Sequence, residues 1–150
     1  MIIPLLLVGI LGLAFGSFAS VIIHRLHIQD PYLFSGRSRC PQCATTLGWR
    51  DLIPIVSFLI NKWQCRFCKQ PISLRYPLLE LAMAGTFVLT GILIGLESFP
   101  WLLFYLYIAF TFVSLRLYDL LLQEIPDRLV IPPLLITIIG MLWTEKIPMP

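Results

Sequence analysis

Two Cys-x-x-Cys pairs lie in a polar loop that is flanked by apolar stretches long enough to cross a membrane. The pairs are Cys40–Cys43 and Cys65–Cys68, and they contain all four cysteines of the chain. Two such knuckles match a four-cysteine zinc ribbon, in which thiolates fill every position of a tetrahedral ion and leave none for water. The pairs therefore predict a structural zinc site, and four free thiols are the alternative.

The composition indicates a membrane protein. The chain is 58% hydrophobic and only 13% charged, whereas a soluble domain carries about 25% charged residues. Four apolar stretches are candidate transmembrane helices: residues 2–23, 77–96, 101–115 and 129–143. The last two are short, and Pro132 and Pro133 are expected to interrupt the fourth near its start. We expect an all-α polytopic membrane protein of about four transmembrane helices, with the zinc-ribbon-like loop between the first and second.

The distribution of basic residues predicts the topology. All 11 Lys and Arg residues except Lys146 fall in the loop between the first two spans or in the connection between the last two. The positive-inside rule makes that side cytoplasmic and places the N-terminus outside. Cytosolic thiols stay reduced, which favours zinc over disulfides. The first stretch lacks the basic start of a secretory signal peptide, so we expect it to remain as a helix.

The chain divides into three parts: a first transmembrane helix at residues 1–23, a cytoplasmic four-cysteine loop at 24–76, and further transmembrane helices at 77–150. Small residues recur at helical spacing in the first helix, at Gly9, Gly12, Gly16, Ser17 and Ser20. They predict a face for close helix packing in lipid. The apolar segment 51–60 is too short to span, so we expect it to lie in the interface or against the knuckles.

Three acidic residues near the membrane are candidates for chemistry. Asp119 lies among apolar residues at the end of the third span, where a carboxylate marks a functional candidate. The alternative is an interfacial Asp paired with Arg116 on the same helix face. Asp127 has the place of an N-cap or first-turn acid of the fourth span. Glu80 lies at the entry of the second span, with Pro77 in the first turn and the helix dipole favouring the acid. For Glu80 the structural interpretation is favoured.

Several motifs, taken together, resemble the type IV prepilin peptidases, a family of membrane aspartic proteases. Residues 12–18 resemble the family's opening Gly-Ser-Phe signature, and residues 24–26 occupy the place of its Tyr-Arg-Leu. Residues 37–43 resemble the family's first knuckle, and residues 51–57 resemble its Asp-Leu-Ile-Pro segment. Residues 65–80 resemble its second knuckle and the Ile-Ser-x-Arg-Tyr-Pro segment that follows. Asp119 and residues 125–127 resemble its Asp…Ile-Pro-Asp motif.

The resemblance implies an enzyme of the bacterial inner membrane that removes the leader from type IV prepilin or pseudopilin precursors. Such precursors serve type IV pili, type II secretion or competence. The Cys loop is typical of members that also methylate the new N-terminus with S-adenosylmethionine. The resemblance makes Asp119 one of two catalytic aspartates and leaves the S-adenosylmethionine site unassigned. Its partners would be these precursors and membrane lipids.

The chain also departs from the family pattern. The second catalytic aspartate of the family lies in a Gly-x-Gly-Asp motif, and residues 1–150 contain none. Leu121 and Leu122 replace an Asp and a His that many members carry. We therefore expect the N-terminal portion of such an enzyme, truncated and without peptidase activity by itself. The alternative from another class is a non-enzymatic, membrane-anchored zinc-binding interaction module. A nucleic-acid partner is not expected, because the loop is tethered closely to two spans.

Overall fold

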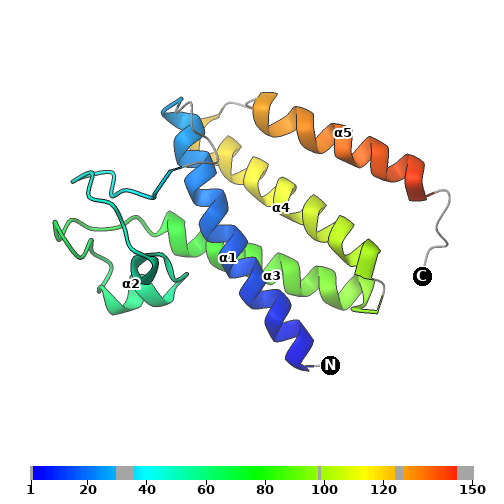
Figure 1. The fold of residues 1–150 in the computed structure, drawn as a ribbon, viewed down its shortest axis with the longest axis horizontal. Helices are drawn as coiled ribbons and strands as arrows, with labels where there is room; N and C mark the ends of the chain where they lie inside the picture. Colours follow the sequence, from blue (N-terminus) through cyan, green and yellow to red (C-terminus); the bar gives the residue numbers. More distant parts are fainter. Residues whose placement is uncertain (1, 30–35, 98, 124–126, 145–150) are drawn as a thin grey trace.

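The computed structural model describes residues 2–29, 36–97, 99–123 and 127–144, and its longer elements are all helices (Figure 1). The elements in chain order are α1 (Ile2–His27), η1 (Trp49–Leu52, a short 3-10 helix), α2 (Val56–Ile60), α3 (Arg75–Ile94), α4 (Phe99–Leu122) and α5 (Asp127–Thr144). The described residues include no strand, only two isolated bridges in the loop. The predicted all-α class with an intervening loop is confirmed.

Within the described residues, three helices are long and apolar enough to cross a membrane: α1, α3 and the part of α4 from Phe99 to Leu120. They correspond to the first three predicted spans. The third is longer than the predicted stretch 101–115, because the charged residues that end an apolar run can still continue a helix. The fourth predicted span forms α5, whose apolar run, Val130–Met141, is shorter.

The expected interruption of the fourth span by Pro132 and Pro133 is wrong. Both prolines lie inside α5, which continues through them to Thr144. Proline removes one backbone donor and crowds the carbonyl four residues earlier, but its φ is close to the helical value, and apolar helices of membrane proteins tolerate it. The Thr137 hydroxyl donates to the Pro133 carbonyl at 2.8 Å within the same helix.

Helices α1 and α3 pack so closely that the backbone of one helix contacts the backbone of the other. A Cβ atom added to Gly12 would lie 2.6 Å from Ala84 Cα, and one added to Gly16 would lie 2.6 Å from Glu80 Cα. As the contact moves along α1 toward its C-terminus, it moves along α3 toward its N-terminus, so the helices are antiparallel. The small residues therefore form the predicted packing face, because only glycine permits this approach.

The core lies where α1, α3 and α4 meet. Met83 and Phe87 of α3 are its largest fully buried side chains. Phe15 of α1 contacts both neighbouring helices, with ring-centroid distances of 5.8 Å to Phe87 and 5.5 Å to Phe110 of α4. The outward faces carry exposed apolar side chains, including Ile2, Ile3, Leu6, Leu7 and Ile10. Such a surface suits lipid rather than water.

The short apolar segment of the loop forms η1 and α2. Phe58 of α2 is buried and stacks on Trp63, which precedes the second knuckle, at a centroid distance of 6.2 Å. The Trp63 N–H donates to the Phe58 carbonyl at 2.9 Å, and the Ile72 N–H donates to the Trp63 carbonyl at 2.7 Å. The segment therefore packs against the residues that flank the second knuckle, and a position in the membrane interface stays a prediction.

The close contact predicts that Gly12→Ala destabilises the helix pair. The added methyl group meets the backbone of α3, which cannot rotate away, so the helices must separate. We expect the free energy of unfolding to fall by about 1–3 kcal/mol, as for overpacked cores. The measurement is loss of helicity during titration with denaturing detergent.

Gly85→Ala is the matched control, because it makes the same change in the same helix pair but has no atom within 4 Å of the added Cβ. Alanine is the better helix former, so this variant should unfold at the same or a slightly higher detergent concentration. Equal destabilisation by the two variants would contradict the close α1–α3 contact.

Candidate functional site

The two Cys-x-x-Cys knuckles share one backbone hydrogen-bond pattern. In the first, the Ala44 N–H donates to the Cys40 carbonyl at 2.9 Å, and the Cys40 N–H donates to the Thr45 carbonyl at 3.0 Å. The second repeats both bonds at the equivalent positions, Lys69 to Cys65 and Cys65 to Gln70, each at 2.9 Å. The repeated pattern turns both cysteines of a knuckle toward one point.

The residue that follows each knuckle adopts a left-handed backbone conformation. Ala44 has φ +55° and Lys69 has φ +59°, although neither is glycine. Directly outside each knuckle an isolated antiparallel bridge closes the turn, Arg39 with Thr46 in the first and Gln64 with Pro71 in the second. Strain of this kind persists only where the surrounding structure requires it. Here it keeps both turns in the same shape.

The four thiols lie together. All the Sγ atoms of Cys40, Cys43, Cys65 and Cys68 are within 4.8 Å of one another, and the Cys40 and Cys68 sulfurs are 3.9 Å apart. Zinc–thiolate bonds of about 2.3 Å in a tetrahedron would separate the sulfurs by about 3.8 Å. The predicted tetrad is therefore brought together with the donor type and spacing that fit a zinc ion.

Hydrogen bonds favour the thiolate form at two of the four positions. Hydrogen bonds to the Thr45 side chain and backbone lower the pKa of Cys43 to about 6. Backbone hydrogen bonds at Cys68 and Phe67 lower the pKa of Cys65. For Cys68, a backbone hydrogen bond at Gln70 acts in the same direction, but burial and the neighbouring thiols raise the pKa to about 11. Thiolate is the form that binds metal, and a divalent cation would offset the repulsion between four of them.

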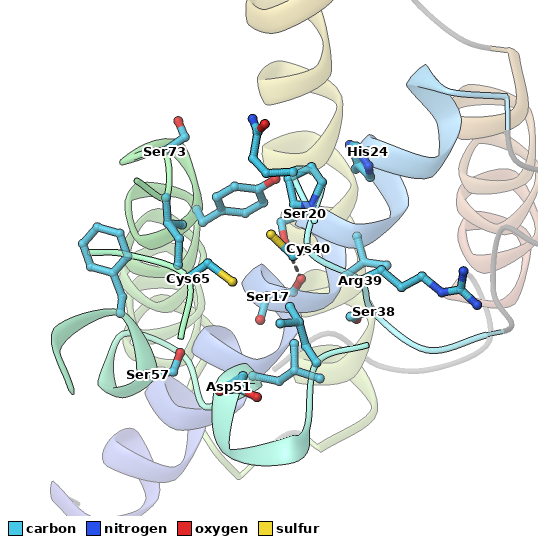
Figure 2. A pocket seen from close by; sticks show the side chains of 18 of the residues that line it. Ser17, Ser20, His24, Ser38, Arg39, Cys40, Asp51, Ser57, Cys65 and Ser73 are labelled. Atoms are coloured by element: carbon cyan, nitrogen blue, oxygen red, sulfur yellow. Dashed lines mark hydrogen bonds between the residues drawn. The ribbon is translucent and has the colours of Figure 1, made fainter. Parts of the chain in front are cut away.

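A cavity of about 850 Å³ lies between the C-terminal half of α1, the Cys loop and the start of α3. Figure 2 shows Ser17, Ser20 and His24 of α1 around the same space as Cys40, Cys65 and Asp51 of the loop. The Ser20 hydroxyl donates to the Ser17 carbonyl at 2.6 Å. The volume is in the range of pockets that hold small organic ligands.

Two carboxylates line this cavity, and they differ in their partners. The side chain of Asp51 is 6% exposed, accepts a hydrogen bond from the Gly48 N–H at 3.0 Å, and lies 3.6 Å from Arg66 Nε. Glu80 is 7% exposed and accepts a hydrogen bond from the Ile55 N–H at 2.8 Å. Ile55 itself has φ +61°, so the carboxylate holds a strained turn of the loop against α3.

The structural interpretation of Glu80 agrees with its hydrogen bond from Ile55, but its expected stabilisation by the dipole at the start of the helix is wrong. Helix α3 begins at Arg75 and has no acidic residue in its first turn, because the helix includes residues before Pro77. Glu80 is therefore in the second turn, beneath the close approach of Gly16. The signal that could have pointed to a functional role for Glu80 in the sequence is a carboxylate inside an otherwise apolar span.

Asp119 lies apart from this cavity, in the last turn of α4. Its carboxylate is 3.5 Å from Arg116 Nη1 and its side chain is 44% exposed. The structure thus contains the predicted Arg116–Asp119 pair and leaves the carboxylate accessible. Asp127 is the exposed first residue of α5, whereas Ile125 and Pro126 of the same motif lie outside the described residues.

Comparison with family models matches residues 10–94 to the bacterial peptidase A24 N-terminal domain. The matched region contains most of α1, both knuckles, the cavity carboxylates and all of α3. No solved structure matches the chain.

The curated proteins that are similar to this chain are named as enzymes that process prepilins or prepilin-like proteins. The chain is 44% identical over 126 residues to a prepilin leader peptidase/N-methyltransferase of Klebsiella pneumoniae, which covers 81% of this chain and 54% of that protein. It is 38% identical to the protein of that name from Bacillus subtilis, covering 81% and 48%. It is 35% identical to a type 4 prepilin-like proteins leader peptide-processing enzyme of Escherichia coli, covering 91% and 53%. The chain thus spans about half the length of these relatives.

The sulfur geometry predicts one zinc ion per chain, bound by all four thiols. In zinc-replete protein we expect no thiol that reacts with a disulfide reagent, and four after a strong chelator removes the metal. Cys40→Ser should lose the zinc, because a site of four cysteines has no spare ligand. The measurements are elemental analysis and thiol titration of protein in detergent.

Ser38→Ala is the matched control, because Ser38 lines the same cavity two residues before the first knuckle. Its carbonyl still accepts the hydrogen bond from Leu47, so this variant should keep its zinc. Four reactive thiols in the zinc-replete, unmodified chain would contradict the metal site.

Proposed function

Because the chain belongs to the bacterial peptidase A24 N-terminal domain family, we propose that it forms the N-terminal portion of a prepilin leader peptidase. The enzyme would cleave the leader of type IV pilin-like precursors and methylate the new N-terminus, as its relatives' names indicate. The observation that carries the proposal is the family match over residues 10–94, joined to a four-cysteine cluster and membrane-length helices in the same chain.

The proposed location is the bacterial inner membrane, with the N-terminus outside and the Cys loop in the cytoplasm. The antiparallel packing of α1 and α3 and the return of α4 support one common side for the loop and for Asp119. Nearly all Lys and Arg residues lie in the segments on that side, which favours the cytoplasm. Precursor leaders would therefore be cut and modified on the cytoplasmic side.

Residues 24–76 are proposed as a zinc-stabilised domain between the first helix, residues 1–23, and the helices of residues 77–150. The loop has few buried apolar side chains in its described part, namely Cys40, Phe58 and Cys65. So small a core supplies little folding energy, and a structural metal is a common substitute. Zinc would then hold the two knuckles together and fix the wall of the cavity.

Asp119 is proposed as one of two catalytic aspartates. In such a pair one carboxylate is ionised and activates water, while the other is protonated and polarises the peptide carbonyl. The accessibility of the Asp119 carboxylate supports this role. Residues 1–150 contain no Gly-x-Gly-Asp motif, so the second aspartate would have to come from outside them.

The proposal predicts that residues 1–150 alone do not remove the leader from a coexpressed prepilin. When a segment that carries the Gly-x-Gly-Asp motif of a relative is joined to them, cleavage should appear. Asp119→Asn should then abolish it, because a neutral amide cannot activate water. The shift of the precursor band on a gel measures cleavage.

Glu97→Gln is the matched control, since Glu97 is exposed and lies in the connection at the opposite end of α3 and α4. Cleavage should be unchanged in this variant. Efficient cleavage that survives Asp119→Asn would refute the catalytic role.

The cavity between α1 and the Cys loop is the candidate site for methylation. S-adenosylmethionine would supply an electrophilic methyl group there. The volume of about 850 Å³ and a lining with both acidic and basic side chains, among them Asp51 and Arg39, fit a charged nucleoside. Equilibrium binding of radiolabelled S-adenosylmethionine to the zinc-replete chain tests the fit without any turnover.

The alternative function is that of a non-enzymatic, membrane-anchored zinc module that binds a partner. This alternative predicts bound zinc but neither cleavage nor methylation when the Gly-x-Gly-Asp segment is supplied. The cluster of four cysteines favours neither function, because it would serve as a scaffold in both. Cleavage in the joined protein separates them.

A further inference from the structure

Glu80 is a buried carboxylate without a cationic partner in the described part of the chain. The ion pairs found there join Asp51 to Arg66 and Asp119 to Arg116, and neither includes Glu80. The partners of Glu80 are the Ile55 N–H at 2.8 Å and the Ser17 side chain. Burying an ionised carboxylate is costly unless a cation or several hydrogen bonds compensate it. A cationic ligand would compensate it here.

The carboxylate lines the 850 Å³ cavity, which gives such a ligand a place. Ser17 and Ser20 of α1 and Tyr76 of α3 line the same cavity. One oxygen of Glu80, Oε2, is held by Ile55. An ionised carboxylate can accept about four hydrogen bonds, so the group is oriented and retains capacity for a ligand.

We propose that Glu80 binds the α-ammonium group of a processed polypeptide and accepts its proton during N-methylation. The inference rests on the methyl transfer of the proposed function and assigns the acceptor side of that reaction. The cavity is lined by the C-terminal half of α1, the Cys loop and the start of α3, which belong to the same end of the helices as the last turn of α4. A new N-terminus made at Asp119 would therefore appear on the side where the cavity lies.

Methyl transfer to this nitrogen requires that it first lose a proton, and a positioned carboxylate can accept that proton. An ammonium has no lone pair, so it must first give one proton to the carboxylate and become an amine. The amine nitrogen then forms an N–CH3 bond while the S–CH3 bond of a sulfonium methyl donor breaks, and the sulfur keeps the electron pair of that bond. The product is a methylated ammonium, a neutral thioether and a protonated Glu80, which releases its proton to water before the next turnover.

The first test is peptide binding to the zinc-replete chain in lipid nanodiscs. The probe is a short leucine- and alanine-rich peptide with a fluorescent C-terminal label, used with a free α-amine or with an N-acetyl group. We expect about tenfold tighter binding of the free amine, since hydrogen bonds between charged groups are stronger than neutral ones. Equal binding of the two peptides by the unmodified chain would overturn the proposal without any variant.

Glu80→Gln is the decisive variant, because glutamine keeps the shape and can still accept the hydrogen bond from Ile55. It should lose the preference for the free amine. Glu80→Asp keeps the charge and should retain part of that preference. Zinc content and thiol protection report whether each variant is folded. A folded Glu80→Gln chain that keeps the full preference would refute the role of Glu80.

The same variant in the joined, cleavage-competent protein separates this inference from the proposed function. Glu80→Gln should lower the methylation rate by about 100-fold relative to the cleavage rate, as expected for loss of a general base. Wild-type protein that neither cleaves nor methylates would refute the proposed function. Wild-type protein that does both, with methylation unchanged by Glu80→Gln, would refute this inference alone.

A final comparison tests whether Glu80 binds the ammonium group of the polypeptide or the cationic methyl donor. Binding of S-adenosylmethionine and of its neutral thioether product, S-adenosylhomocysteine, is measured for wild type and Glu80→Gln. If Glu80 holds the amine, the substitution should change neither affinity. Weakened binding of S-adenosylmethionine, with the amine preference intact, would assign Glu80 to the methyl donor and overturn the proposal: to its sulfonium if S-adenosylhomocysteine is unaffected, to its α-ammonium if both are weakened.

Discussion

The backbone contact between α1 and α3 is the constraint on which the rest of the structure depends. Gly12 and Gly16 let the two helices approach until a single methyl group would collide with α3. In lipid, helices gain little from the hydrophobic effect on association, so close van der Waals packing is a main source of attraction. The same contact sets Glu80 beneath Gly16 and brings both ends of the Cys loop together at one end of the helix pair.

The loop depends on that pair and on its own cysteines. Its two knuckles repeat one hydrogen-bond pattern, and the left-handed residues Ala44 and Lys69 follow them at equivalent positions. The four inward-facing thiols could hold a metal ion, and zinc would cross-link a loop with little core. The hydrogen bond from Ile55 to Glu80 then ties the loop to the membrane helices. Metal site, cavity and helix pair thus form one connected unit.

The acidic residues divide between two places. Asp119 is accessible in the last turn of α4, beside Arg116, and lies outside the cavity. Glu80 is buried at the cavity wall without a cation among the described residues. A carboxylate that must activate water needs access to solvent and substrate, whereas one that must bind an ammonium benefits from burial. Under the proposed function, two separate sites would allow cleavage and methylation to follow one another on the same side of the membrane.

The sequence by itself determined the helical class, the first three spans, the packing face of Gly12 and Gly16, and the four-cysteine cluster. Each of these follows from a pattern of residue types along the chain: apolar runs, glycines at helical spacing, or Cys-x-x-Cys pairs. It also placed Asp119 beside Arg116, three residues away. Only the tertiary structure decided the length of α4 and the position of Glu80, since a charged residue leaves open whether a helix continues past it. The cavity could not be predicted from the sequence either, because its walls come from segments that only the antiparallel helix contact brings together.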